Sequence, residues 1–271
     1  AWMLLLLNFG TMTLREVLEP AISIAIKGYP LVPNIINTIK SVEQLFKNEW
    51  TSSAEIYLPK GNLPQEGDFF TNKKMAETYL RIINEAEAKS KDKKEQIQQA
   101  RNIWSKGFIA EEIDNYCKNN SVMDTTEKRH KGLLTADDLA DWSATIEKPC
   151  SYNYKNYTVC KTGPWGQGPT FLQQLALLKN FDLDALDENS PEFVHLVVEA
   201  TKLAFADREA FYGDTNFNEV PMETLLSEDY NKDRRNLITD HASMEVRPGN
   251  IPGFGGNVVV RPKGQTSESF S

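Results

Sequence analysis

The stretch Lys161–Leu178, "KTGPWGQGPTFLQQLALL", places a short loop between a strand-like run and an apolar helix. The loop region contains three glycines, Gly163, Gly166 and Gly168. A glycine-rich loop before a helix suggests phosphate binding, because the amides at a helix N-terminus attract anions. The order G-x-x-G-x-G, however, is the reverse of the dinucleotide fingerprint, and no lysine follows as in a P-loop. Pro169 also removes one of the first helical amides. These residues argue against nucleotide binding.

Composition places the chain among ordinary globular proteins. It has 271 residues, of which 40% are apolar and 25% charged, and it carries a net charge of -8. This length allows one large domain or two small ones. The negative charge argues against a general binder of nucleic acid or membrane surfaces, so no nucleic-acid partner is expected.

The first ten residues, "AWMLLLLNFG", have neither an initiator methionine nor the basic start of a signal peptide. The apolar run Trp2–Leu7 is too short to span a bilayer, so no membrane segment is predicted. The run resembles the middle of a buried helix, and the chain is therefore expected to be a fragment or a processed piece. No compartment is predicted, because any export signal would lie upstream.

The three cysteines leave at least one thiol unpaired. Cys150 and Cys160 flank "SYNYKNYTV", which predicts a β-hairpin around Lys155. A two-residue turn would place Cys160 opposite Ser151, with the two sulfurs on opposite faces, whereas a three-residue loop would place the cysteines opposite each other. Free, semi-buried thiols are the favoured interpretation.

No metal or cofactor is expected. The sequence has no Cys-x-x-Cys pair, and its three histidines are widely separated, so a zinc site is not predicted. These histidines are His130, His195 and His241.

Helix signals dominate the first half of the chain. Thr13 and Glu16 form a candidate capping box for a helix that Pro20 should kink or end. Apolar residues recur near a helical period over residues 31–50. Further helices are predicted over residues 73–89 and 94–118, the second bent or broken at Gly107.

The second half shows similar signals around the hairpin and the glycine loop. Thr135 and Asp138 predict a capped helix start with Leu139 and Trp142 turned inward, and Ser190 with Pro191 predicts the start of the longest helix. After the loop, three apolar residues share one helix face, Phe171, Leu175 and Leu178. The pattern as a whole predicts one continuous, helix-rich layer with a few strands.

Four blocks occur in one order at close spacing: "LLTADDLADW", "YTVCKTGPWGQGPTFLQQLALLKNFDL", "VVEATKLAFADREAFYGD" and "VPMETLLSEDYNKDRR". Together they resemble the large subunit of gamma-glutamyltranspeptidases, also called glutathione hydrolases. The opening "FGTMTLREVLEPAISIA" is similar to an earlier segment of that subunit. The resemblance covers residues 1–256 as an incomplete large-subunit region, and residues 257–271 are expected to be a loop-like tail near the processing junction.

This resemblance implies an N-terminal nucleophile hydrolase with an α+β fold, in which this region is the helix-rich large-subunit part of a four-layer αββα sandwich. Such proteins cleave themselves into two subunits, and the freed N-terminal threonine attacks an amide carbonyl with its own amine as base. The expected partners are the small catalytic subunit from the same precursor and a small γ-glutamyl substrate. The acyl group then passes to water or to an amino acid.

The family's best-known functional elements are expected outside the given residues. The family nucleophile lies just beyond a loop like "RPGNIPGFGG", yet the chain has no matching threonine junction before Ser271. Thr266 is the nearby candidate, but its flanks do not match. The arginine that holds the substrate α-carboxylate belongs to a segment upstream of Ala1. No catalytic residue is therefore assigned within the chain.

Trp165 and Gln167 are the candidate substrate-binding residues, as the border of the acyl-donor pocket. Trp165 could instead be a packing wedge, which is the favoured interpretation because large aromatics usually anchor cores. The loop glycines are expected to permit a tight strand-to-helix turn with little side-chain bulk, and replacing any of them that has a positive φ is expected to destabilise the fold.

Other tempting residues favour structural interpretations. In "FADRE", Asp207–Glu209 could suggest acid–base chemistry, but an ion pair between Arg208 and another element is favoured. His195 is expected to be a hydrogen-bonded histidine, His130 a solvated one, and Asp214 a turn residue. Besides the enzyme subunit, two alternatives remain open: a catalytically inactive fragment or degenerate homologue that acts as a structural or binding module, and an unrelated helical binding domain.

Overall fold

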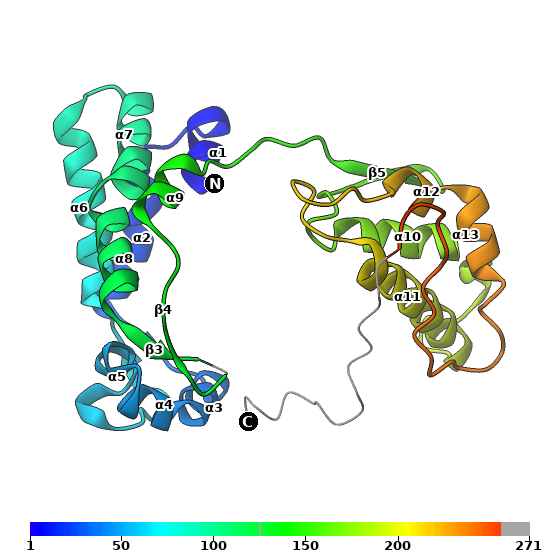
Figure 1. Cartoon of the computed structure of the whole chain (residues 1–271), viewed down its shortest axis with the longest axis horizontal. Helices are drawn as coiled ribbons and strands as arrows, with labels where there is room; N and C mark the ends of the chain where they lie inside the picture. The colour runs from blue at the N-terminus through cyan, green and yellow to red at the C-terminus, as the bar shows by residue number, and fades with distance from the viewer. Residues whose placement is uncertain (125, 256–271) are drawn as a thin grey trace. The chain divides into compact units, whose positions relative to one another are not determined.

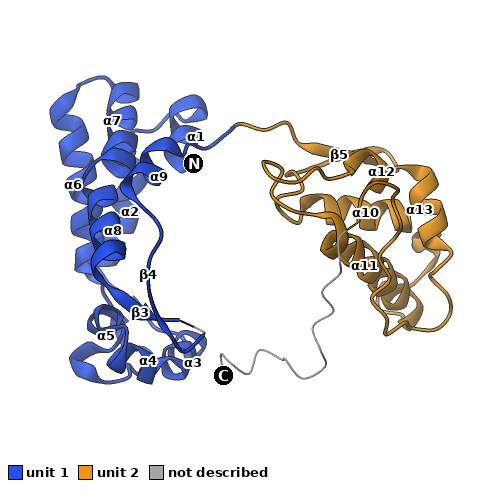
Figure 2. Cartoon of the chain, viewed as in Figure 1, with its two compact units in different colours: residues 1–145, 265–271 blue, residues 146–264 orange. Residues whose placement is uncertain are grey.

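The chain forms two compact units in a computed structural model that describes residues 1–124 and 126–255. Unit 1 runs from Ala1 to Thr145, and unit 2 begins at Ile146 (Figures 1 and 2). The sequence predicted one continuous layer instead. The division arises because each unit buries apolar clusters of its own.

Unit 1 is mostly helical, with two small antiparallel pairs of strands (Figure 1). Its helices are α1 (Trp2–Phe9), α2 (Leu14–Lys27), α3 (Pro33–Ser41), α4 (Glu43–Asn48), α5 (Thr51–Tyr57), η1 (Pro59–Gly61), α6 (Lys73–Lys89), α7 (Lys93–Lys106), α8 (Phe108–Asn119) and α9 (Ala136–Asp141). Its strands are β1 (Tyr29–Pro30), which pairs with β2 (Phe69–Phe70), and β3 (Ser121–Met123), which pairs with β4 (Arg129–Lys131).

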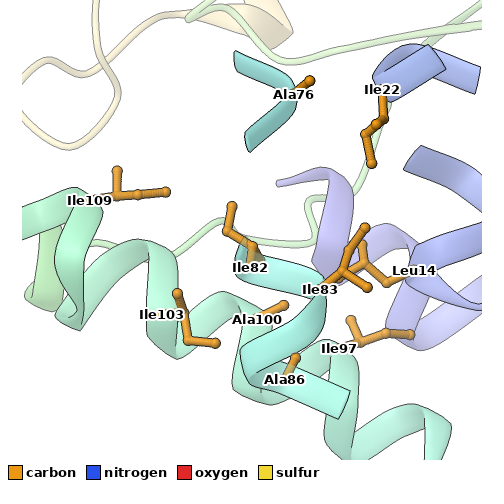
Figure 3. Close-up of a cluster of buried hydrophobic side chains, with 10 residues drawn as sticks. All are labelled: Leu14, Ile22, Ala76, Ile82, Ile83, Ala86, Ile97, Ala100, Ile103 and Ile109. Carbon is orange, nitrogen blue, oxygen red and sulfur yellow. The ribbon is translucent and has the colours of Figure 1, made fainter. Parts of the chain in front are cut away.

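The core of unit 1 lies between α2, α6, α7 and α8 (Figure 3). Ile82 and Ile83 of α6 and Ile97 of α7 are at most 1% exposed. Each such side chain contributes roughly 1.5–3 kcal/mol through its burial. The predicted bounds of α6 are confirmed, and so is the break at Gly107, where α7 ends and α8 begins.

The amino-terminal helices differ from the prediction in three respects. The capping box of Thr13 and Glu16 is confirmed. Of the two outcomes predicted at Pro20, a kink or a helix end, the end was wrong, because α2 continues through this residue. The helical pattern over residues 31–50 is divided into α3 and α4 at Val42. Finally, α1 has no fully buried residue: Met3, Leu6 and Leu7 pack on the core, while the other face, including Trp2, is exposed.

Helix α9 begins with the predicted capping box, in which the Thr135 and Asp138 side chains each bond the other residue's backbone amide. Trp142, however, is 67% exposed, so the prediction that it turns inward was wrong. The helix ends at Asp141, one residue before the tryptophan, which changes the direction of that side chain.

Unit 2 consists of one hairpin and a group of helices (Figure 2). Its elements are β5 (Cys150–Tyr154), β6 (Tyr157–Lys161), α10 (Gly168–Leu178), η2 (Leu183–Ala185), α11 (Pro191–Phe211), α12 (Met222–Leu225) and α13 (Glu228–Arg235). Leu177 of α10 packs against Ala200 and Leu203 of α11, and a second cluster joins Phe211, Leu225 and Ile251.

The hairpin has a two-residue turn, the first of the two alternatives that the sequence left open. Tyr154 pairs with Tyr157, so Cys160 lies opposite Ser151 and Cys150 opposite Lys161. Because adjacent positions on a strand face opposite sides, this register keeps the two cysteines apart. Both thiols are free.

The start of α11 is confirmed: the Ser190 hydroxyl accepts from the Phe193 amide, and Pro191 is in the first turn. Helix α10 contains the three apolar residues that the sequence places on one helix face, and of these Phe171 is 42% exposed whereas Leu178 is buried. The inward face of α10 is formed mainly by Leu172, Gln173, Ala176 and Leu177, a set that includes a polar residue.

The described residues therefore form a helix-rich α+β fold with three two-stranded antiparallel sheets. Among them, no helix combines the length and apolar character that crossing a bilayer requires. The tail predicted over residues 257–271, which includes Thr266, lies outside the described residues, so its boundary stays a prediction.

Candidate functional site

The loop between β6 and α10 turns the chain tightly, and the expected need for little side-chain bulk is confirmed at one of its glycines. None of its three glycines has a positive φ. At Gly168 an added Cβ would lie 2.7 Å from both the carbonyl oxygen and Oγ1 of Thr162. Gly163 and Gly166 have ordinary space around them. Close approach of the backbone, and not a left-handed conformation, is therefore what requires glycine, and it does so at Gly168 alone.

Trp165 lies on the surface of unit 2. Its side chain is 59% exposed, and its indole Nε1 donates to Glu147 Oε2 at 2.6 Å. The favoured interpretation of Trp165 as a packing wedge was therefore wrong. The hydrogen bond leaves much of the aromatic ring accessible, which suits contact with a ligand or another chain.

Gln167 is also exposed and is the N-cap residue of α10, where its side chain makes no capping hydrogen bond. Its side-chain amide therefore accepts no hydrogen bond from the first backbone amides of α10. Trp165 and Gln167 lie two residues apart on one loop, and both side chains are exposed to solvent. The pocket-border role of these residues stays a prediction.

The buried charge of unit 2 centres on Asp207 of α11, whose side chain has no exposed surface. Asp207 Oδ1 accepts from Arg234 of α13 at 3.0 Å and from the Gly249 amide at 2.7 Å. Oδ2 accepts from Gln173 Nε2 at 2.6 Å. This carboxylate is fully engaged as an acceptor, as a buried charge must be.

The predicted ion pair of Arg208 with another element was wrong. Arg208 pairs with its neighbour Glu209 at 3.3 Å, and the long-range ion pair belongs to Asp207 and Arg234. Neighbouring helical residues point in different directions, so the register decides which of the three turns inward. The signal that could have found Asp207 is its place among Ala204 and other apolar residues of the buried stripe.

A second buried carboxylate, Glu199, lies eight residues earlier on α11. It pairs with Lys202, and with Arg247 at 2.9 Å, and it accepts from the Ser243 amide at 3.2 Å. Burial raises the pKa of Glu199, but the hydrogen bonds from Lys202 and Ser243 and the charges of Lys202 and Arg247 outweigh it. The pKa of Glu199 is therefore held below its usual value.

Two tyrosines near Asp207 remain protonated over the neutral range. Burial raises the pKa of Tyr212 to about 12. Burial and the negative charge of Asp207 also raise the pKa of Tyr230. Neither phenol is poised to act as a base at neutral pH.

The histidines are engaged in structural contacts. His195 Nε2 donates to the Thr239 carbonyl at 2.6 Å, as the hydrogen-bonded interpretation predicted. His130 is exposed, and its Nδ1 lies 2.7 Å from Asp124 Oδ2. The Asp124 carboxylate accepts hydrogen bonds from Thr126, which have the larger effect, and from His130. Together they lower the pKa of Asp124 to about 2. Among the described residues, the side-chain contacts of His130 and His195 are with a carboxylate and a backbone carbonyl.

Comparison with known proteins identifies the family. A sequence model of the family described as gamma-glutamyltranspeptidase matches residues 1–268. The chain belongs to the gamma-glutamyltranspeptidase family. The family is one of enzymes, and its members are N-terminal nucleophile hydrolases.

Individual relatives agree with this assignment. The chain is 31% identical to the glutathione hydrolase-like YwrD proenzyme of Bacillus subtilis, over 86% of this chain and 39% of that protein. The solved structure of LmbA2991HD is 48% identical, with a TM-score of 0.85, over 92% of this chain and 42% of the other. The gamma-glutamyltranspeptidase of Helicobacter pylori is 26% identical, with a TM-score of 0.75, over 91% and 65%. The chain thus spans about two-fifths of the curated relative.

Proposed function

We propose that this chain is the large-subunit part of an enzyme that hydrolyses or transfers γ-glutamyl, or related acyl, groups from glutathione-like amides. The observation that carries the proposal is the match to one family along nearly the whole chain, combined with coverage of only 39% of a proenzyme relative. The helix-rich α+β fold agrees with a contribution to one side of a four-layer αββα sandwich.

The chemistry is assigned to a threonine beyond Ser271, in a small subunit from the same precursor. Self-cleavage adds one water across one peptide bond, leaving a carboxylate on the large subunit and an amine on the threonine. The threonine hydroxyl then attacks the substrate carbonyl, and the threonine amine takes the proton. The amide C–N bond breaks, the departing amine receives that proton and leaves, and the acyl group remains on the threonine as an ester. The acyl-enzyme ester is resolved by water, which gives hydrolysis, or by an amino acid, which gives transfer.

Within this chain, Trp165 and Gln167 are proposed to border the acyl-donor pocket. Three features support this: the 59% exposure of Trp165, the side-chain amide of Gln167, which makes no capping hydrogen bond, and the position of both residues just before α10. An aromatic face and a primary amide together suit a substrate that carries both methylene and carboxylate groups.

The proposal is tested on the full-length precursor by electrophoresis and N-terminal sequencing. We expect two fragments, the smaller beginning with threonine, together with release of product from a γ-glutamyl anilide. A precursor that stays intact and inactive would contradict the proposal and favour a degenerate homologue that acts as a binding module.

Kinetics of Trp165→Ala in the processed enzyme test the pocket. We expect kcat/KM for a γ-glutamyl substrate to fall about tenfold, because the ring would contact the bound acyl donor, with little change in melting temperature. Trp142→Ala is the matched control, since this tryptophan is similarly exposed but lies in unit 1. Unaltered kinetics for Trp165→Ala would remove the residue from the pocket.

A further inference from the structure

The segment of residues 243–251, here called the anchored segment, follows α13 and lies on α11 through polar contacts. Its large apolar side chains do not hold its first half, because Met244 is 95% and Val246 51% exposed. Two buried carboxylates of α11 hold it instead, Glu199 and Asp207. They lie eight residues apart, roughly 12 Å along the helix.

Glu199 holds the start of the anchored segment. Its carboxylate accepts from the Ser243 amide at 3.2 Å and from Arg247 at 2.9 Å. Lys202, which pairs with Glu199, also donates to the Ser243 carbonyl at 2.7 Å. Both backbone groups of Ser243 are therefore bound by side chains of α11.

Asp207 and Arg234 hold the end of the segment. Asp207 accepts from the Gly249 amide at 2.7 Å, and Arg234 donates to the Arg247 carbonyl at 2.5 Å. A Cβ at Gly249 would overlap the Tyr230 hydroxyl, so the backbone at this point lies in close contact with a side chain of α13. Ile251 then enters the cluster with Phe211 and Leu225.

Buried charged side chains of α11 and α13 thus hold a segment that has no regular secondary structure. Buried carboxylates cost free energy unless they are fully paired, and replacing such pairs by apolar side chains is often no less stable. Stability alone is therefore a weak reason for two such pairs on one short segment. Their common effect is to fix the backbone between residues 243 and 251.

We propose that Glu199, Asp207 and Arg234 are positioning residues that fix the anchored segment so that the chain after it reaches the self-cleavage geometry. This inference rests on the proposed function, because it assumes that the precursor cleaves itself beyond this segment. The three residues touch the backbone of the segment and not the reacting atoms. Misplacing reacting groups by about 1 Å can slow a reaction by about a hundredfold.

The test measures self-cleavage of the full-length precursor. Asp207→Asn and Glu199→Gln keep the side-chain shape and remove the charge. Glu209→Gln is the matched control, an exposed carboxylate on the same helix. Leu177→Ala is the stability control, because it opens a cavity in the α10–α11 cluster without touching the anchored segment. Hydrogen exchange of the Ser243 and Gly249 amides reports anchoring directly.

We expect self-cleavage of both charge variants to be slower by at least about tenfold. The two amides should also lose protection while those of α10 keep theirs, and both controls should cleave near the wild-type rate. Charge variants that cleave at the wild-type rate, or no slower than Leu177→Ala at equal melting temperature, would overturn the inference. A wild-type precursor that never cleaves would contradict the proposed function. Independently of cleavage, unchanged protection of the Ser243 and Gly249 amides in the charge variants would overturn the anchoring.

Discussion

At the scale of single residues, Gly168 shows how closely strand and helix approach in unit 2. Replacing it by alanine would bring a Cβ within 2.7 Å of the Thr162 carbonyl oxygen, too close for either backbone to tolerate. We expect Gly168→Ala to lower the free energy of unfolding by about 1–3 kcal/mol through overpacking. Denaturant unfolding measures the change.

Gly163→Ala and Gly166→Ala are the controls, because their nearest contacts would be 3.5 Å and 3.4 Å. They should change stability by less than about 0.5 kcal/mol. Equal effects of all three substitutions would show that the loop is required as a whole and that the close approach at Gly168 is not decisive.

Single residues also show what sequence reasoning can and cannot find. The caps at Thr13, Thr135 and Ser190 were predictable, because a capping side chain bonds an amide only three residues away. Asp207 was not assigned correctly, since its partners Arg234 and Gly249 are distant in the sequence. Trp165 was misjudged because aromatic character does not reveal which side of a loop faces solvent.

At the scale of elements, the hairpin of β5 and β6 places its two thiols in different surroundings. Burial raises the pKa of the Cys150 thiol, while Cys160 is exposed. Because the thiolate is the reactive form, we expect alkylation of Cys160 by iodoacetamide to be faster than that of Cys150. Mass spectrometry of peptides from briefly treated protein measures both. Equal rates would contradict the difference in burial between the two thiols, and a recovered Cys150–Cys160 disulfide would contradict the register set by the two-residue turn.

The pairing of α11 with the anchored segment should depend on pH. The folded-state pKa of Glu199 lies below its usual value of 4.5, so its ionised form stabilises the fold. This contribution is complete above about pH 4.5 and is lost as the pH falls through the lower, folded-state pKa. We expect Glu199→Gln to lower the melting temperature at pH 7, and the difference from wild type to shrink towards pH 3. A difference that grows on acidification would reverse the sign of the linkage.

Element boundaries were predicted where the pattern is strong and local. The bounds of α6 and the break at Gly107 followed from periodicity and a helix-breaking residue. The break at Val42 was missed, because no glycine or proline marks it. The inward face of α10 does not follow from its apolar residues alone, because the polar Gln173 is buried and bonds Asp207 while the apolar Phe171 is exposed.

At the scale of the whole molecule, each unit buries a core of its own, yet large apolar side chains remain exposed in both. Trp2 and Leu133 in unit 1 are 88% and 93% exposed, and Phe217 and Met244 in unit 2 are 84% and 95% exposed. Burial of such side chains against another chain would gain free energy. The small subunit of the proposed precursor is the partner expected to cover part of it.

An activity assay on the chain by itself shows whether its own residues can carry out the proposed chemistry. Purified residues 1–271 should release no product from a γ-glutamyl anilide, because the proposed nucleophile and its amine belong to the small subunit. The processed full-length protein, assayed beside it, should turn the substrate over. Turnover by the 271-residue chain that persists after its N-terminal amine is blocked would contradict the assignment of the chemistry to residues outside it.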